Sequence, residues 1–375
     1  MQPEVALEEL SDFAAEPSAK PIEDVHLDDL LREGCERGSS DLHLTVGLPP
    51  VVRVDGSLAY LSYQPLSPTE TQRLVYDILT NDQVQHFESV RELDFSYGVK
   101  GVGRFRVNVY KQRGSVGVAL RTIPDRIPTF EQLNLPAILR DLTRKHSGLI
   151  LVTGPTGSGK STTIACMIDT INSERPVHIM TMEDPIEYLH RHKRGMINQR
   201  ELNTDTDSFA NALRAVLRED PDVIVIGEMR DLETIQAALT MAETGHLVFG
   251  TLHTRNAPQT VDRVIDVFPP HQQEQIRVQL SNSLEAVVAQ QLLPRIGGGR
   301  IATLEIMVAT AAVRNLIREG KSHQLYSAIE TGAQYGMQTM DKVLADTHRN
   351  GKVTLEEAQA RSIDRENFQR FLQGG

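Results

Sequence analysis

Nine consecutive residues have the composition and spacing of a phosphate-binding loop. They are Gly154, Pro155, Thr156, Gly157, Ser158, Gly159, Lys160, Ser161 and Thr162. The first eight match GxxxxGK[S/T], in which glycines let backbone N–H groups turn inward around phosphates. An apolar run at 149–152 precedes the loop and a helical pattern at 162–171 follows it. The pattern predicts that Lys160 contacts the β- and γ-phosphates of ATP and that Ser161 offers its hydroxyl to Mg²⁺.

Acidic residues follow two apolar runs that read as buried strands. Glu228 comes after the run 223–226, and Glu183 and Asp184 follow the run 177–182. Beside a phosphate-binding loop, a carboxylate holds the metal shell or orients the attacking water, because phosphoryl transfer depends mainly on positioning. Without such a loop, Glu228 reads as a helix cap and the acidic pair as a solvated turn. We predict Glu228 and Glu183 as catalytic residues, either of which could be the general base. The predicted metal contacts are Ser161, Glu228 and Asp184.

Two histidines flank a third apolar run. His246 and His253 lie at opposite ends of the run 247–252, so they are too far apart to bind one metal ion. His253 falls at the end that faces a nucleotide in a parallel sheet, and we predict that it senses the γ-phosphate. A lone histidine is more often structural, and that interpretation suits His246.

Charge and cysteine content restrict the function further. The formal net charge is −11, but residues 1–30 contain nine acidic residues and one lysine, or −8, which leaves about −3 for the rest. This balance gives nucleic acid no overall attraction, so no nucleic-acid partner is expected. Cys35 and Cys166 are the two cysteines, and they cannot build a tetracysteine zinc site. No signal pattern and no run of ~18 apolar residues occurs, which predicts a cytoplasmic chain without direct membrane insertion.

The order of the expected elements divides the chain into segments. Residues 1–21 are predicted to be an acidic, disordered leader, and residues 22–122 an α+β domain with two hairpins. Three prolines between 123 and 136 indicate a linker. In residues 137–375, apolar runs alternate with helical patterns as far as about residue 310, and helices follow. This alternation predicts an α/β fold with a mainly parallel, doubly wound sheet and ligands at the carboxyl ends of its strands.

Taken together and in this order, the motifs resemble those of the secretion ATPase superfamily, the motors of type IV pili and type II secretion. The four motifs are the loop at 154–161, the acidic box at 181–185, the element at 227–231 and the histidine box at 244–254. The resemblance extends upstream to 39–44 and 103–108. Downstream, residues 312–319 look like the signature segment of the PilT-like retraction ATPases. The whole resemblance covers roughly residues 22–355.

Several expectations follow from the resemblance alone. It implies a RecA-like ATPase core, a PAS-like N-terminal domain and a homohexamer that binds ATP and Mg²⁺ between domains. The arginine fingers of the family map to Arg104, Arg106 and Arg121, which would stabilise charge in the transition state. The expected partner is a platform protein of the inner membrane, with other pilus ATPases as further candidates. The expected location is the inner face of the cytoplasmic membrane, and the expected task is pilus retraction in twitching motility.

Four other functions stay open. Pilus extension and type II secretion ATPases usually carry a tetracysteine zinc module, which this chain cannot build. That difference and the segment 312–319 favour retraction. A nucleic-acid translocase with the same core and a nucleotide-binding regulator are the remaining alternatives.

Overall fold

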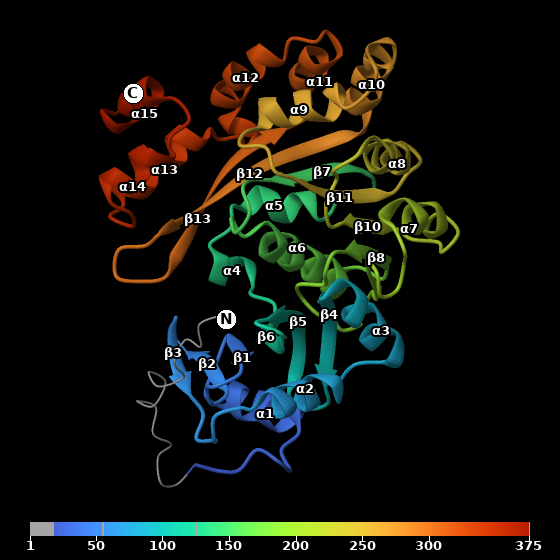
Figure 1. Ribbon diagram of the computed structural model, residues 1–375. Helices are drawn as coiled ribbons and strands as arrows, with labels where there is room; N and C mark the ends of the chain where they lie inside the picture. Colours follow the sequence, from blue (N-terminus) through green and yellow to red (C-terminus); the bar gives the residue numbers. More distant parts are fainter. Residues whose placement is uncertain (1–18, 55, 125, 375) are drawn as a thin grey trace, which may run out of the picture. The chain divides into compact units, whose positions relative to one another are not determined.

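The computed structural model describes residues 19–54, 56–124 and 126–374, and the chain forms two compact units, 1–125 and 126–375 (Figure 1). Most of the predicted acidic leader, residues 1–18, lies outside the described residues. Lys20, which was predicted to belong to that leader, donates its N–H to the Ser62 oxygen at 3.0 Å and pairs with Tyr63. Lys20 therefore takes part in the fold of the N-terminal unit, although it belongs to the segment predicted to be disordered.

The N-terminal unit contains a six-stranded antiparallel sheet in the order β3-β2-β1-β6-β5-β4. Its strands are β1 (Asp41–Leu44), β2 (Val51–Val54), β3 (Ser57–Tyr60), β4 (Glu92–Val99), β5 (Gly103–Gln112) and β6 (Ser115–Ile123). Its helices are α1 (Leu27–Glu36), α2 (Pro68–Tyr76) and α3 (Asn81–Val90). Both predicted hairpins, β2–β3 and β5–β6, are present. Helix α2 begins where expected because Ser67 and Glu70 form a capping box.

The second unit is built on a seven-stranded sheet in the order β13-β12-β7-β11-β10-β8-β9. Its strands are β7 (Gly148–Thr153), β8 (His178–Glu183), β9 (Met196–Glu201), β10 (Val223–Ile226), β11 (Leu247–Leu252), β12 (Leu284–Pro294) and β13 (Arg300–Val308). Neighbouring strands are parallel except for the β12–β13 hairpin. The prediction of a mainly parallel α/β sheet is confirmed.

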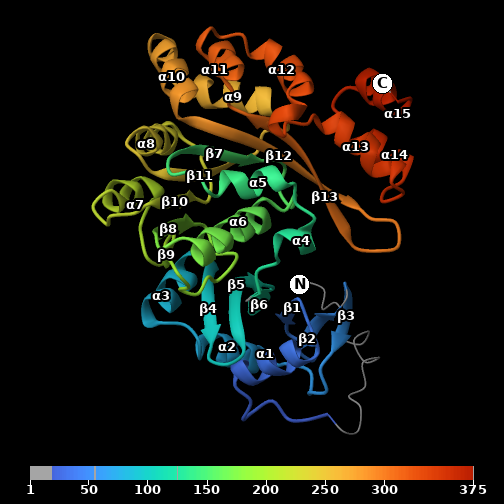
Figure 2. The ribbon, with the colours of Figure 1, turned by 180° about the vertical axis from the view of Figure 1, so that it is seen from behind.

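Helices cover both faces of this sheet (Figures 1 and 2). On one face lie α5 (Ala137–Leu142) and α6 (Lys160–Glu174), together with the short α4 (Phe130–Leu133) inside the predicted linker. On the other face lie α7 (Phe209–Val216), α8 (Leu232–Glu243), α9 (Ala257–Asp266), α10 (Pro270–Ser283), α11 (Ala311–Arg318) and α12 (Leu325–Thr331). Along β7, Leu149 and Leu151 belong to one core and Ile150 and Val152 to the other. Burial on both faces explains why these strands read as continuous apolar runs.

The last three helices pack on the β12–β13 hairpin. They are α13 (Met340–Arg349), α14 (Leu355–Arg361) and α15 (Arg365–Leu372). Leu293 of β12 shares their core with Met340, Leu344, Phe368 and Phe371. Helices were expected after about residue 310, and α13, α14 and α15 are three of them.

A buried carboxylate joins this helical group to the rest of the unit. Glu305 of β13 is fully buried, and its two carboxylate oxygens accept the N–H groups of Ala257 at 2.8 Å and Met340 at 3.3 Å. Ala257 and Met340 are the first residues of α9 and α13, whose N-termini attract negative charge. Burial outweighs these hydrogen bonds and raises the pKa of Glu305 to about 7.

We expect Glu305 to make the folded state less stable as pH rises. The ordinary pKa is 4.5 and the folded value about 7, so the unfolded chain releases this proton first as pH increases. Its stabilising contribution is therefore complete below pH 4.5 and is lost as pH approaches 7, by up to roughly 1.4 kcal/mol per pH unit. Urea unfolding from pH 4.5 to 8 should show this loss in the wild type and not in Glu305→Gln. Parallel pH profiles of the two proteins would contradict it.

Candidate active site

The predicted phosphate-binding loop connects the end of β7 to the start of α6. Gly154 has φ of +139°, and a Cβ there would lie 2.2 Å from the backbone oxygen of Gln290. Gly159 precedes α6 with φ of +87°. A side chain at either position would strain the backbone, and at Gly154 it would also collide with β12. Close packing therefore keeps the loop in this shape. The N-terminus of α6 follows the loop directly, which is the arrangement that binds phosphate groups in proteins.

Lys160 lies along the inside of this loop. Its Nζ donates to the carbonyl oxygens of Gly154 at 2.8 Å and Pro155 at 3.1 Å. Burial lowers the pKa of Lys160, and the charges of Glu228 and Glu187 oppose this shift. The hydroxyl of Ser158 is buried without a hydrogen-bond partner among the described residues. An ammonium group inside the loop and an unsatisfied hydroxyl suit a loop that receives phosphate oxygens.

Gln290 of β12 supports the loop, and no sequence pattern had indicated this role. Its side chain is 2% exposed, donates from Nε2 to the Ser158 oxygen at 2.7 Å and accepts from Thr163 Oγ1 at 2.8 Å. Thr163 belongs to the first turn of α6. Gln290 therefore braces both the loop and the helix that follows it.

The ends of β8 and β10 bring the two predicted catalytic carboxylates into one region. Gly227 donates its N–H to the Met182 oxygen at 2.8 Å, and a Cβ at Gly227 would lie only 3.0 Å from that oxygen. Glu228 comes next, while Glu183 is the last residue of β8 rather than the first residue after it. The Glu228 charge also acts on Lys160. One edge of the sheet therefore presents the loop and both carboxylates.

Glu228 is held by the side chains of Arg230 and His253. Arg230 contacts both of its oxygens, at 2.5 Å from Nε and 2.6 Å from Nη2, and His253 Nε2 lies 3.0 Å from Oε1. The Arg230 hydrogen bond is the largest cause that lowers the pKa of Glu228. His253 reaches this position because Thr251 of β11 binds the Gly227 carbonyl oxygen at 2.5 Å. Glu228 stays ionised, as a metal contact or water-orienting group must.

Glu183 lies in the opposite kind of environment. Its carboxylate accepts from Thr181 Oγ1 at 2.7 Å, Gln199 Nε2 at 3.0 Å and Glu187 N at 3.4 Å. Burial outweighs these hydrogen bonds and raises its pKa. Two carboxylates whose pKa values move apart divide the acid–base work between them, and the group with the raised pKa accepts a proton more readily.

The remaining predicted residues of this unit occupy different places. Asp184 is exposed, and its negative charge raises the pKa of Arg230. His246 lies at the opposite end of β11 from His253, with Nδ1 3.0 Å from the Met241 oxygen, which suits the structural role expected of it. Within residues 19–54, 56–124 and 126–374, no group of three or more His, Cys, Asp or Glu side chains could hold a metal ion. Ser161 and Glu228 still offer the oxygen ligands that Mg²⁺ prefers, with phosphate and water completing the shell.

The three predicted arginine fingers share one face of the N-terminal sheet. Arg106 and Arg121 are directly paired across β5 and β6, and Arg104 is two residues from Arg106. Arg121 Nε lies 2.9 Å from Asp41 Oδ1 and is 72% exposed. The alternate residue Phe105 is buried in the core. Their assignment as fingers stays a prediction.

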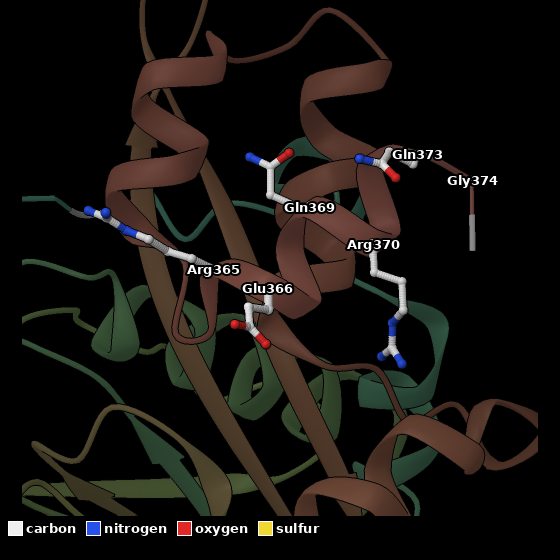
Figure 3. A pocket seen from close by; sticks show the side chains of 6 residues that line it. All are labelled: Arg365, Glu366, Gln369, Arg370, Gln373 and Gly374. Atoms are coloured by element: carbon white, nitrogen blue, oxygen red, sulfur yellow. The ribbon is translucent and has the colours of Figure 1, made fainter.

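A hollow elsewhere in the second unit is lined by α15 and the residues that follow it (Figure 3). Its lining residues are Arg365, Glu366, Gln369, Arg370, Gln373 and Gly374. None of the predicted site residues contributes to it, and Arg370 is already paired with Glu330. The phosphate-binding loop is the better candidate for a functional site.

Comparison with known proteins agrees with this geometry. The family described as Type II/IV secretion system protein matches residues 127–298. A type IV pilus retraction ATPase, PilT, from Pseudomonas aeruginosa is 50% identical over 340 residues, 91% of this chain and 99% of the relative. A twitching motility protein from Neisseria gonorrhoeae is 48% identical over 320 residues, 85% of this chain and 86% of the relative.

A solved structure is similar in fold as well as in sequence. It is described as the pilus retraction motor PilT with bound ADP, and its TM-score is 0.88 at 51% identity. The match covers 92% of this chain and 100% of that chain. Among the described residues, no helix combines the length and the apolar character that a membrane crossing requires.

Proposed function

The chain belongs to the Type II/IV secretion system protein family, and on this premise we propose that it is the ATPase that powers type IV pilus retraction. The observation that carries this proposal is the 50% identity to a retraction ATPase over 99% of that relative's length. The phosphate-binding loop and both carboxylates lie within the family match at 127–298. The chain is an ATPase, and its mechanical task is the proposed part.

The site residues divide the work of ATP hydrolysis. Backbone N–H groups of residues 154–162 and the Lys160 ammonium bind the phosphates. Ser161 and Glu228, with Asp184 nearby, would hold Mg²⁺, which would neutralise charge on the β- and γ-phosphates. Glu183 accepts the proton of the attacking water, because its pKa is raised, whereas Glu228 stays ionised. His253, in contact with Glu228, responds to the γ-phosphate.

The assembly that couples this reaction to movement is a homohexamer. Arg104, Arg106 and Arg121 of a neighbouring subunit then supply positive charge to the transition state. Each ATP shifts the linker at 123–136 between states that differ in these contacts. The moving units act on a platform protein of the inner membrane, which places the ring at the inner face of that membrane, with other pilus ATPases as possible further partners.

Loss of the protein should leave cells with more or longer pili and no twitching. Retraction removes pilin from the surface, so its absence leaves extension unopposed. Electron microscopy of pili and a stab assay of twitching on the deletion strain measure this result. A deletion strain without pili would instead identify the chain as an extension ATPase. Complementation with the wild-type chain is the control.

The role of segment 312–319 in retraction is tested better by substituting its surface residues than by deleting the segment. It coincides with α11, whose Val313 and Ile317 are buried in the core. Deleting it would damage folding together with function. Arg318 is exposed and donates to Asn315 Oδ1 at 3.0 Å, so Arg318→Ala tests the surface alone.

Stimulation of the ATPase by DNA would favour the translocase alternative.

A further inference from the structure

The loop that follows Glu183 is fastened to the edge strand β9 by side chains. Glu201 accepts the N–H of Ile186 at 3.1 Å. Gln199, two residues earlier, donates to the carbonyl of Tyr188 at 2.8 Å and accepts the N–H of His190 at 2.8 Å. Every second residue of the loop is therefore held from the same face of β9.

Gln199 also binds the carboxylate of Glu183. Its Nε2 donates to Glu183 Oε1 at 3.0 Å as well as to the Tyr188 oxygen. These contacts fix the orientation of the amide, because the reversed orientation would direct its oxygen at a carboxylate and its NH₂ group at an N–H. The same amide thus fixes the loop and one oxygen of the carboxylate.

Tyr188 carries this arrangement to the nucleotide-binding residues. Its hydroxyl lies 2.9 Å from Oγ1 of Thr162, in the first turn of α6. A series of hydrogen bonds thus connects Thr162 to Glu183 through Tyr188 and Gln199, and all four residues belong to the second unit. The first turn of α6 is therefore connected to the Glu183 carboxylate by the side chains of Thr162, Tyr188 and Gln199 and by the Tyr188 carbonyl.

We propose that Gln199 is a positioning residue for ATP hydrolysis, which orients the Glu183 carboxylate and connects it through Tyr188 to the phosphate-binding helix. The inference rests on the proposed role of Glu183 as the general base. The Gln199 hydrogen bond also lowers the pKa of Glu183 against the effect of burial. The neighbouring acid Glu187 raises that pKa, and Glu201 is the β9 partner of Glu183.

Gln199→Met removes the amide while keeping the length of the side chain. We expect kcat for Mg²⁺-ATP to fall about 10- to 100-fold, as for a misplaced catalytic group. KM for Mg²⁺-ATP should stay within about twofold of wild type, because the residues that hold the phosphates are unchanged, so the loss should appear in kcat alone. Affinity for ADP, measured by calorimetry on the full chain, should stay within about twofold of wild type.

Asn198→Leu is the matched control. Asn198 precedes Gln199 on β9, points to the other face and contacts His178 Nε2 at 2.9 Å. We expect wild-type kcat and KM for this variant. If Gln199→Met unfolds, Gln199→Glu preserves the side-chain size and replaces the donor with an acceptor, so its kcat should also fall while KM stays unchanged.

Two results would overturn the inference. One is a wild-type kcat in the folded Gln199 variants, and the other is a rise in KM and a loss of ADP affinity as large as the fall in kcat, which would leave Gln199 a purely structural role. Different results would show that the proposed function itself, or the role of Glu183 as the base, is wrong. In that case the wild type would not hydrolyse ATP, or Glu183→Gln would retain wild-type kcat.

Discussion

Glu183→Gln should lower kcat for ATP hydrolysis by about 10²- to 10⁴-fold, the contribution typical of a general base. Glutamine has nearly the same shape but cannot accept the proton of the attacking water. Nucleotide binding should persist, because the phosphates are held by residues 154–162 rather than by Glu183. Steady-state hydrolysis and ADP calorimetry on the purified chain measure the two quantities separately.

The pH profile distinguishes Glu183 from Glu228. Burial raises the pKa of Glu183, whereas Arg230 lowers that of Glu228. The wild-type kcat should therefore decline on the acid side above the ordinary carboxyl pKa, as Glu183 takes up a proton. Residual activity of Glu183→Gln should lack this limb. An unchanged limb in that variant would assign it to another group and remove Glu183 from the role of base.

Lys160→Ala should abolish measurable hydrolysis and weaken nucleotide binding. The ammonium group is the charged donor of the loop, and hydrogen bonds to charged groups contribute about 1.5–3 kcal/mol, or roughly 10- to 150-fold in affinity. The fold should survive, because the Lys160 contacts are with carbonyls of its own loop. Calorimetry with ADP and a hydrolysis assay report the outcome.

Lys321→Ala is the matched control for this variant. Lys321 is exposed and pairs with Glu319 at 2.7 Å, and such surface pairs contribute little to stability. Its ADP affinity and kcat should equal those of the wild type. Normal turnover in Lys160→Ala would mean that hydrolysis does not use this loop, and the proposed mechanism would fail with it.

The parts of the site that were predictable are those with local sequence patterns. The loop at 154–161 carries its own spacing, and the strands before Glu183, Glu228 and after His246 are continuous apolar runs. Burial on both faces produces such runs in a parallel sheet. The parallel strands then bring their carboxyl ends to one edge, so the sequence was enough to place Glu183, Glu228 and His253 at that edge, while their catalytic roles stay predictions.

The supporting amides could not be predicted in this way. Gln199 lies on the polar edge strand Met196–Glu201, which has no apolar run to mark it. Gln290 lies on Leu284–Pro294, whose Leu, Glu, Ala and Gln residues favour a helix, and tertiary pairing overrides that preference. The hydrogen bond between Gln290 and Ser158 joins residues 132 positions apart. Pairing across such distances leaves no local signal in a single sequence.

The carboxylate of Glu305 connects the C-terminal helices to the edge of the sheet that carries Glu228. His253 contacts Glu228, and α9 starts a few residues after His253, at Ala257. The N–H of Ala257 donates to one oxygen of Glu305. The other oxygen holds Met340 at the start of α13. The starts of α9 and α13 can therefore move apart only if one of the two hydrogen bonds to Glu305 breaks.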